Sequence, residues 1–228
     1  MDFLFPPFCL VCEAPLLKGE RTICAACYLQ MRPIAAPYCQ KCGRPIRDGS
    51  LCRVCRRYGR VYLKHRSVGI YDGVLAEAVK SLKYRGRLSI AQRLGRMMSS
   101  VALADPDMGE VDAIVPVPLH RVRYRERGFN QALLLSKEVA GELGFPVVAG
   151  SLIRTRYTTQ QTRLSRKKRR GNVAGAFKVN NVESIKDKRI LLVDDVTTTG
   201  ATIEECARAL LEGGASAVCC LTAAIALT

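Results

Sequence analysis

The chain has 228 residues, of which 48% are hydrophobic and 25% charged, and its formal net charge is +16. The length and composition are typical of a soluble globular protein with one large domain or two unequal ones. The positive charge is concentrated in residues 1–60, 121–127 and 154–170, the last of which carries eight basic side chains and no acidic one. This pattern excludes a role in general solubility alone and favours a polyanionic partner, such as pyrophosphate or nucleic acid.

Neither end of the chain predicts export or a membrane span. The N-terminal stretch FLFPPF is short, is interrupted by prolines and follows an acidic residue, so we expect no signal peptide and a cytoplasmic location. Residues 215–228 lack charges but are too few to cross a bilayer, and we interpret them as a closing core strand.

The front of the chain is rich in cysteine. Eight of the 11 cysteines form four Cys-x-x-Cys pairs, namely Cys9 and Cys12, Cys24 and Cys27, Cys39 and Cys42, and Cys52 and Cys55. Their spacing predicts two zinc ribbons with tetrahedral thiolate coordination. Consecutive pairs are expected to share an ion, although spacing also allows an interleaved arrangement, and disulfides or an iron–sulfur cluster are the alternatives. Zinc would be structural, since so short a segment cannot bury enough apolar surface to fold alone. The other three cysteines, Cys206, Cys219 and Cys220, are interpreted as core residues.

The middle of the chain predicts strands and helices in alternation. Residues 67–71 are expected to form a short strand, and apolar residues at helical spacing predict helices over 74–82 and 90–98. Lys83, Tyr84 and Arg85 are interpreted as a solvated helix end, with ligand contact as the alternative. Residues 111–119 predict a strand that enters a proline-restricted turn.

A basic loop, HRVRYRERGFNQ, follows that turn, and a helix is expected to begin near Phe129. Arg125 and Arg127 are candidates for holding pyrophosphate, because guanidinium groups match phosphate oxygens in pairs. A basic surface loop without a ligand is the alternative. Residues 154–170 have few large apolar side chains and should be mobile on their own, after which the sequence AGAF is expected to return to the sheet.

The stretch 189–202, RILLVDDVTTTGAT, carries the strongest functional signal. Four aliphatic residues predict a strand buried on both faces, and a polar turn and a helix should follow. Backbone N–H groups at the start of such a helix, beside Gly200, favour a bound phosphate. The carboxylates of Asp194 and Asp195 can accept hydrogen bonds from sugar hydroxyls, so ribose 5-phosphate fits this stretch. A buried strand that ends in a solvated acidic turn is the alternative.

The same stretch resembles the signature of type I phosphoribosyltransferases that binds 5-phosphoribosyl 1-pyrophosphate (PRPP). The resemblance implies that Asp194 and Asp195 hold the ribose hydroxyls, that Mg²⁺ accompanies PRPP, and that Arg127 helps to neutralise the leaving group. It further implies a PRPP-binding loop and a flexible basic hood over the pyrophosphate; the loop comprises Thr197, Thr198, Thr199, Gly200, Ala201 and Thr202, and the hood includes Arg154, Gln160, Arg163 and Arg170. Purine-salvage members usually carry an Asp at the position of Thr198, so the general base of those enzymes is missing here.

The whole motif order is similar to that of the ComF family, a group of competence-related proteins with a double zinc ribbon. The motifs are the cysteine module, SLKYRGR, PVPLHRVRYRERGFNQ, the basic hood and VDDVTTTGAT. The resemblance implies an α/β fold of the type I phosphoribosyltransferase kind, with a mostly parallel sheet and flanking helices over residues 61–228, behind a zinc-ribbon module over residues 1–60. It implies PRPP as a ligand and a role in natural transformation, with single-stranded DNA and competence or recombination proteins as partners. The alternative is a true Mg²⁺-dependent phosphoribosyltransferase without a DNA role, whose acceptor the sequence does not identify.

Overall fold

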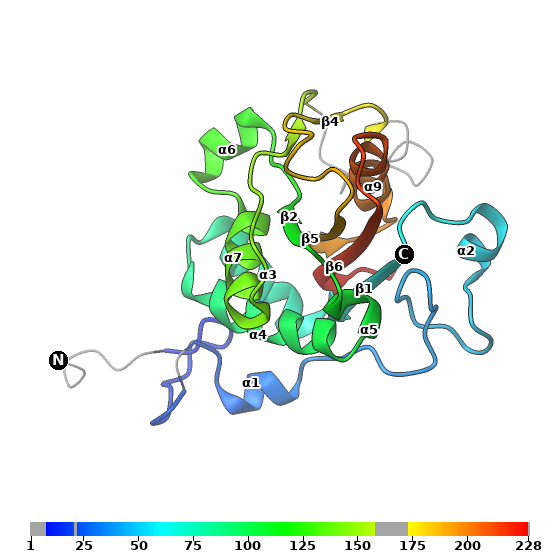
Figure 1. Cartoon of the computed structure of the whole chain (residues 1–228). Coiled ribbons are helices and arrows are strands. Elements are labelled where there is room, and N and C mark those ends of the chain that lie inside the picture. Colours follow the sequence, from blue (N-terminus) through cyan, green and yellow to red (C-terminus); the bar gives the residue numbers. More distant parts are fainter. Residues whose placement is uncertain (1–7, 21, 158–172, 228) are drawn as a thin grey trace.

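A four-stranded parallel sheet organises the protein (Figure 1). The computed structural model describes residues 8–20, 22–157 and 173–227. The strands follow the order β1 (Lys64–Ile70), β6 (Ala217–Ile225), β5 (Arg189–Thr197) and β2 (Ala113–Pro116). Strand β6, predicted as a closing core strand, is central and buried, and its pairing with β5 runs from Arg189↔Ala217 to Thr197↔Ile225.

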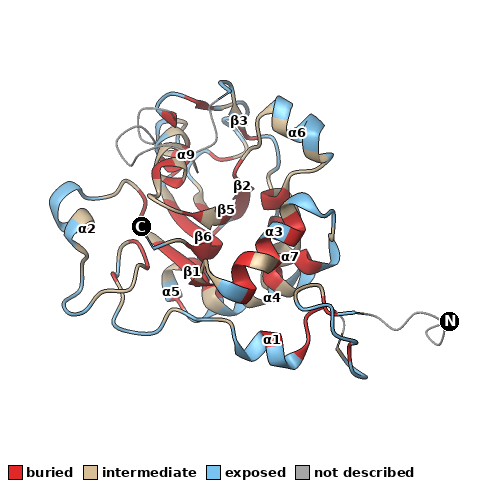
Figure 2. Cartoon of the chain, turned by 180° about the vertical axis from the view of Figure 1, so that it is seen from behind, coloured by how far each residue is buried: buried red, intermediate tan, exposed pale blue. Residues whose placement is uncertain are grey.

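Side chains of the central strands alternate between two apolar layers, as the pleat of a strand requires. Leu191 and Val193 pack with helices α3 (Gly73–Tyr84), α4 (Ser89–Leu103) and α7 (Gln131–Leu143). Ile190 and Leu192 pack on the opposite face with helix α9 (Ala201–Glu212) and with a small antiparallel sheet of β3 (Leu152–Arg154) and β4 (Phe177–Val179). Figure 2 shows the buried sheet between these layers. This arrangement confirms the predicted α/β class, and the expected core cysteines Cys206, Cys219 and Cys220 are all buried.

The cysteine-rich segments lie on two different parts of the domain (Figures 1 and 2). The first segment, with helix α1 (Ala25–Leu29), lies below α4, and its Cys9, Leu16 and Ile23 join the apolar layer of α3 and α4. The second, with helix α2 (Arg53–Tyr58), lies beyond the edge strand β1. It is tied to that strand by hydrogen bonds from His65 N–H to Lys41 O and between His65 Nδ1 and Cys42 O.

Several expectations about element boundaries were wrong. The strand predicted over 111–119 is only four residues long, and a short helix, α5 (Pro106–Gly109), precedes it. The basic segment at 120–127, where a loop was expected, forms helix α6 (Arg121–Arg127). The AGAF segment leads into β4, which pairs with β3 and not with the main sheet. The two acids do not lie in a turn. They continue strand β5, because the pairing of β5 with β6 extends to Thr197.

Candidate functional site

The carboxyl ends of β5 and β2 form a switch point of the sheet, where successive crossover helices pack on opposite faces. Strand β2 ends at Pro116, opposite Val193, whereas β5 continues beside β6 to Thr197. Among the described residues no strand pairs with the β2 side of β5 beyond Val117, whose N–H donates to Val193 O. The helix after β5 packs on one face of the sheet and α7, which follows β2, packs on the other. In open α/β sheets, ligands bind at this kind of switch point.

Asp194 and Asp195 lie at this point and are both buried, with exposed fractions of 9% and 3%. Because successive residues of a strand face opposite sides, Asp195 lies on the α3 side, where its Oδ1 is 2.9 Å from Lys83 Nζ. Its other oxygen, Oδ2, is buried and has no hydrogen-bond partner among the described residues. Asp194 Oδ1 accepts a hydrogen bond of 2.8 Å from the N–H of Asp195. The pair thus holds a buried acceptor oxygen that a hydroxyl could donate to.

The burial of the acids changes their protonation chemistry and that of Lys83. Burial raises the pKa of Asp194 to about 7, the neighbouring Asp195 carboxylate adds to this, and Lys83 opposes it. Burial alone would lower the pKa of Lys83, but the charge of Asp195 outweighs that effect and the pKa of Lys83 is raised. Lys83 therefore stays charged and compensates part of the negative charge of the pair.

The polar loop after β5 ends at the N-terminus of α9. Gly200 is the N-cap residue with φ of 79°, a left-handed conformation that a glycine adopts without strain. Thr197 is buried, and Thr199 Oγ1 accepts a hydrogen bond from Ala201 N–H at 3.4 Å. The loop thus turns sharply onto a helix of 12 residues, whose N-terminus favours a negative charge.

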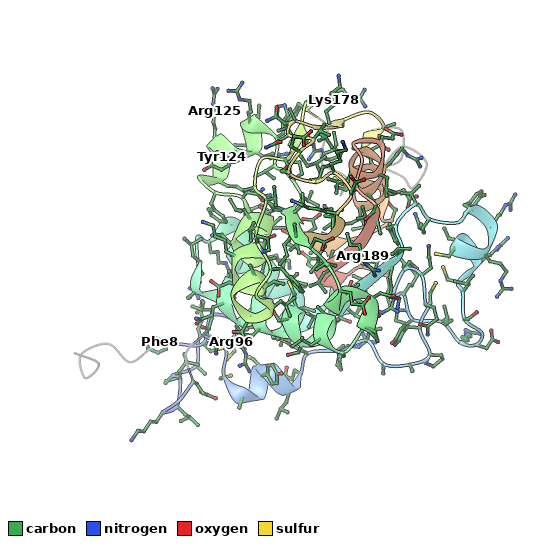
Figure 3. The ribbon with its side chains drawn as sticks, in the orientation of Figure 1. Phe8, Arg96, Tyr124, Arg125, Lys178 and Arg189 are labelled. Carbon is green, nitrogen blue, oxygen red and sulfur yellow. The ribbon has the colours of Figure 1, made fainter. Side chains whose placement is uncertain are left out.

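The predicted pyrophosphate arginines occupy different environments. Arg127 is half-buried, donates from Nη1 to Gln131 Oε1 at 3.0 Å, and lies 5.0 Å from the centre of the Tyr84 ring. Arg125 points away from the body of the protein (Figure 3). Arg154 lies over the Phe177 ring at 5.4 Å, and burial lowers its pKa although the charge of Asp194 acts in the other direction. Gln160, Arg163 and Arg170 lie outside the described residues.

Three residues at this site were not singled out as ligand-site residues from the sequence. Lys83, which was interpreted as part of a solvated helix end, is in fact bound to Asp195, with 17% of its side chain exposed. Arg44 Nη2 donates to Thr198 O at 2.8 Å, and the guanidinium of Arg60 lies beside Gly200. The SLKYRGR motif was a signal for Lys83. No local signal marks Arg44 or Arg60, because both reach the loop from the cysteine-rich segment.

The eight paired cysteines gather into two groups of four, one from Cys9 to Cys27 and one from Cys39 to Cys55. Within each group all sulfur atoms lie within 4.8 Å of one another, and the pairs Cys12–Cys24 and Cys42–Cys52 are 3.7 Å apart. Thiolates around a tetrahedral Zn²⁺ at about 2.3 Å would be about 3.8 Å apart. The donor sets therefore fit structural zinc, and the predicted sequential pairing is confirmed.

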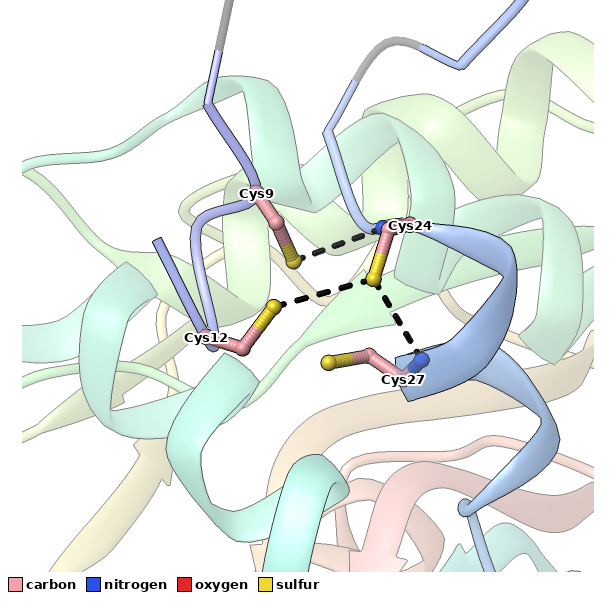
Figure 4. A group of neighbouring side chains, drawn as sticks. All are labelled: Cys9, Cys12, Cys24 and Cys27. Atoms are coloured by element: carbon pink, nitrogen blue, oxygen red, sulfur yellow. Dashed lines mark hydrogen bonds between the residues drawn. The ribbon is translucent and has the colours of Figure 1, made fainter. Parts of the chain in front are cut away.

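Backbone N–H groups donate to two sulfur atoms of the first group and favour the thiolate form of Cys9 (Figure 4). Cys24 N–H donates to Cys9 Sγ and Cys27 N–H donates to Cys24 Sγ, both at 3.4 Å. Burial raises the pKa of the Cys9 thiol, but hydrogen bonds from the backbone of Cys12 and Cys24 lower it to about 6. A thiolate is the form that binds zinc.

Comparison with known proteins matches both parts of the chain. Residues 1–56 match the double zinc ribbon domain, and residues 128–226 match the phosphoribosyl transferase domain. The chain is 34% identical to the DNA utilization protein YhgH of Salmonella typhimurium, over 93% of this chain and 94% of that protein. It is 30% identical to competence protein F of Haemophilus influenzae, over 90% of this chain and 91% of that protein.

It is also 30% identical to competence protein ComFC of Bacillus subtilis, over 92% of this chain and 90% of that protein. Among solved structures, the glutamine PRPP amidotransferase from B. subtilis complexed with ADP and GMP is 18% identical, with a TM-score of 0.42 over 62% of this chain and 30% of that chain. In the part of the chain that the structure describes, no helix has the length and apolar character needed to cross a membrane.

Proposed function

The chain belongs to the ComF family of competence-related proteins, and from this membership and the geometry of the acid pair and the α9 N-terminus we propose that it binds PRPP at the carboxyl end of β5. The observation that carries the proposal is the buried acid pair, which directly precedes the loop that caps α9. A sugar phosphate needs acceptors for its hydroxyls and a positive site for its phosphate, and this stretch offers both within a few residues.

In this proposal the acids bind the ribose. Asp195 Oδ2 is the buried oxygen without a partner, and a ribose hydroxyl would supply the missing donor. Asp194, with a pKa of about 7, accepts most strongly once it is ionised. Mg²⁺ bound with PRPP would supply positive charge that offsets the negative charge of the pyrophosphate.

The loop from Thr197 to Thr202 binds the 5-phosphate, and the polar and basic residues that the sequence predicts for this role bind the pyrophosphate. Arg127 is held by Gln131 and Tyr84 and is therefore oriented before a ligand arrives. Arg154, Gln160, Arg163 and Arg170 complete this polar set, whereas Arg125 points away from the body of the protein and is left out of it. Thr198, which stands where purine-salvage enzymes usually carry a general base, cannot act as one, so we assign PRPP binding and leave the acceptor of a transfer reaction unassigned.

Calorimetric titration with PRPP and Mg²⁺ tests this function. Wild type should bind, and Asp195→Asn should abolish measurable binding because an amide loses one acceptor oxygen and its charge. The matched control is Asp187→Asn. Asp187 lies outside the site, and its φ of 60° is a value that asparagine also adopts readily. If wild type shows no heat of PRPP binding, or Asp195→Asn binds as well as Asp187→Asn, the proposal is wrong.

A second function, contact with single-stranded DNA, is favoured by the surface of α6. This helix buries none of its residues, and it exposes Arg125 and Tyr124. Tyr157 packs edge-on against His120 at 5.1 Å and lies 5.9 Å from Arg123. Arginines beside exposed aromatic rings suit phosphates and stacked bases.

Oligonucleotide binding followed by fluorescence anisotropy tests this second function. The affinity should fall steeply as the salt concentration rises, because phosphate contacts release counterions. Arg123→Glu with Arg125→Glu should weaken it, whereas Arg208→Glu on α9 should not. Arg166 to Arg170, the other candidate DNA contacts, lie outside the described residues. A flat salt profile, or equal loss in both variants, would argue against contact through α6.

A further inference from the structure

The second cysteine group, Cys39 to Cys55, lies against the loop that we assign to the 5-phosphate, although the two are far apart in sequence. Arg44 follows its second cysteine by two residues, and Arg44 Nη2 donates to Thr198 O at 2.8 Å across 154 residues of sequence. Arg60 lies five residues after its last cysteine. An added Cβ on Gly200 would lie 3.8 to 3.9 Å from the Nη1, Cζ and Nη2 atoms of Arg60, so the guanidinium presents its face to this glycine.

The contact with Arg44 determines how the loop presents its backbone. The C=O and N–H of a trans peptide point in opposite directions. When Arg44 binds the carbonyl of Thr198, the N–H of Thr199 points away from Arg44 and the ribbon. Thr199 is one of the residues whose N–H groups would bind an anion.

Arg60 fixes the other end of the same loop. Its Nη1 lies 3.3 Å from Glu204 Oε2 in the first turn of α9, and only 9% of its side chain is exposed. Glu204 also accepts a hydrogen bond from Val61 N–H at 3.0 Å, so the chain leaving the ribbon is joined to α9 by side-chain and backbone contacts together. Arg60 thereby restrains Gly200 and the N-terminus of α9 relative to the ribbon.

The ribbon is itself rigidly attached to the sheet. Gly43 approaches His65 O so closely that an added Cβ would lie 2.7 Å from it, and Arg66 Nη1 donates to Gln40 O at 3.0 Å. The cysteine group that fits zinc is therefore held between β1 and the loop after β5. The first group, Cys9 to Cys27, packs against the helical layer of α3 and α4 instead.

We propose that Arg44 and Arg60 are positioning residues for the sugar-phosphate loop, and that the second zinc ribbon, and not the first, is a structural part of the ligand site. The proposal rests on the proposed PRPP function for the identity of the ligand. It gives the two ribbons different roles: the second one orders the loop at 197–202, and the first one stabilises the helical layer.

The first experiment compares Arg44→Ala with Arg56→Ala, a control in the same ribbon whose side chain bonds to Leu51 O within that ribbon. Ribose 5-phosphate affinity should fall about tenfold in Arg44→Ala, as expected from the loss of one charge-assisted hydrogen bond. Affinity for pyrophosphate alone should stay within about twofold, because that group is assigned to Arg127 and the hood. Arg44→Lys, which keeps the charge, should recover part of the loss. Equal loss for both ligands, or no loss, would overturn the assignment of Arg44.

The second experiment needs no ligand and separates this proposal from the PRPP function. Hydrogen–deuterium exchange of peptides covering 194–203 should be faster in Arg44→Ala and Arg60→Ala than in Arg56→Ala, with unchanged exchange in α4. Loss of the second zinc site by Cys39→Ser with Cys42→Ser should accelerate the same peptides, whereas Cys9→Ser with Cys12→Ser should accelerate those of α4. Zinc content, measured by atomic emission, shows whether each variant has lost one ion, and the substituted cysteines identify the site. If wild type binds no phosphate ligand, the PRPP function fails and this exchange pattern still decides the present proposal; an unchanged loop in the arginine variants overturns it.

Discussion

Replacement of Lys83 by methionine is the sharpest test of the buried acid pair. The Lys83 Nζ to Asp195 Oδ1 distance is 2.9 Å, and the two side chains are only 17% and 4% exposed. Methionine keeps the apolar stem but removes the charge, so the acids are left without their nearest cation. They can then remain ionised or take up a proton, and the less costly course sets the loss of stability.

The magnitude follows from the cost of protonation. To protonate a carboxyl group of ordinary pKa costs about 4 kcal/mol at pH 7 and about 1.5 kcal/mol at pH 5. A Coulomb estimate for two charges at this separation near a protein surface is about 6 kcal/mol, so protonation at about 4 kcal/mol is the less costly course. A carboxyl group whose pKa is raised by folding weakens the fold as the pH rises above its unfolded-state pKa. Lys83→Met should therefore reduce the free energy of unfolding by about 4 kcal/mol at pH 7 and by clearly less at pH 5.

Urea denaturation at the two pH values measures this difference. Lys80→Met on the same helix is the matched control, because Lys80 pairs with Glu77 at 3.5 Å with 51% of its side chain exposed, and its loss should be close to zero. The double variant Lys83→Met with Asp195→Asn should be more stable at pH 7 than Lys83→Met alone. If Lys83→Met costs the same at both pH values, or no more than Lys80→Met, the charge pairing does not stabilise the protein as argued.

Four further outcomes are expected. The pKa of Asp194, about 7 when folded, implies that the free energy of unfolding of the wild type falls by on the order of 2 to 4 kcal/mol between about pH 4 and pH 7. Asp194→Asn should remove most of this pH dependence in urea titrations. An unchanged pH dependence would count against this account of Asp194. Gly200→Ala should reduce the free energy of unfolding by about 1 kcal/mol or more and weaken ribose 5-phosphate binding. The cause is backbone strain at φ of 79° and not a clash, since the added Cβ would meet Arg60 only at ordinary contact distances. Unaltered calorimetric affinity would contradict this. Gly95→Ala should cost about 3 kcal/mol in chemical denaturation, because its Cβ would lie 2.3 Å from Glu138 Cβ where α4 meets α7, whereas Gly141→Ala, where no atom lies within 4 Å, is the control. Atomic emission should find two zinc ions per chain, and a strong chelator should unfold the ribbon segments by circular dichroism; a content near one would mean that only one group binds the ion.

The parts of this structure that depend on local patterns were predictable from the sequence. Cys-x-x-Cys pairs place their own ligands, and the aliphatic run from Ile190 to Val193 predicts a buried strand whatever surrounds it. Helix α9 follows from apolar residues at helical spacing after Gly200. These features fixed the fold class and the location of the candidate site.

The errors arise where neighbouring strands decide the local structure. Asp and Thr have low intrinsic preference for strands, which favoured a turn at 194–197, yet pairing with β6 carries the extended conformation to Thr197. The segment after Pro118 was expected to be a loop because of its charge, but His120 accepts a hydrogen bond from Val122 N–H and caps a helix there. Tertiary pairing and side-chain capping are not encoded by the periodicity of apolar residues.

The contacts of Arg44 and Arg60 were not predictable for a different reason. An arginine after a cysteine knuckle is usually solvated, and nothing in the sequence states where a zinc ribbon docks. Thr198, whose carbonyl accepts the hydrogen bond from Arg44, lies 154 residues away in sequence. The contact exists only because the ribbon packs beside β1. Contacts between residues so far apart in sequence become visible only in the folded structure.

The acids at the end of β5 make the sheet less stable than aliphatic residues at the same positions would. Residues 190–193 of that strand are aliphatic and fully buried, and continuing the pattern at 194 and 195 would have stabilised the sheet. The strand instead carries two buried carboxylates. Burial and the charge of Asp195 raise the pKa of Asp194, Lys83 is needed as a counterion, and Oδ2 of Asp195 has no hydrogen-bond partner among the described residues. They weaken the unliganded fold at the carboxyl end of a parallel strand, where ligand crevices occur. A ligand that donates hydroxyl hydrogen bonds would relieve this cost, as the ribose of the proposed PRPP complex would.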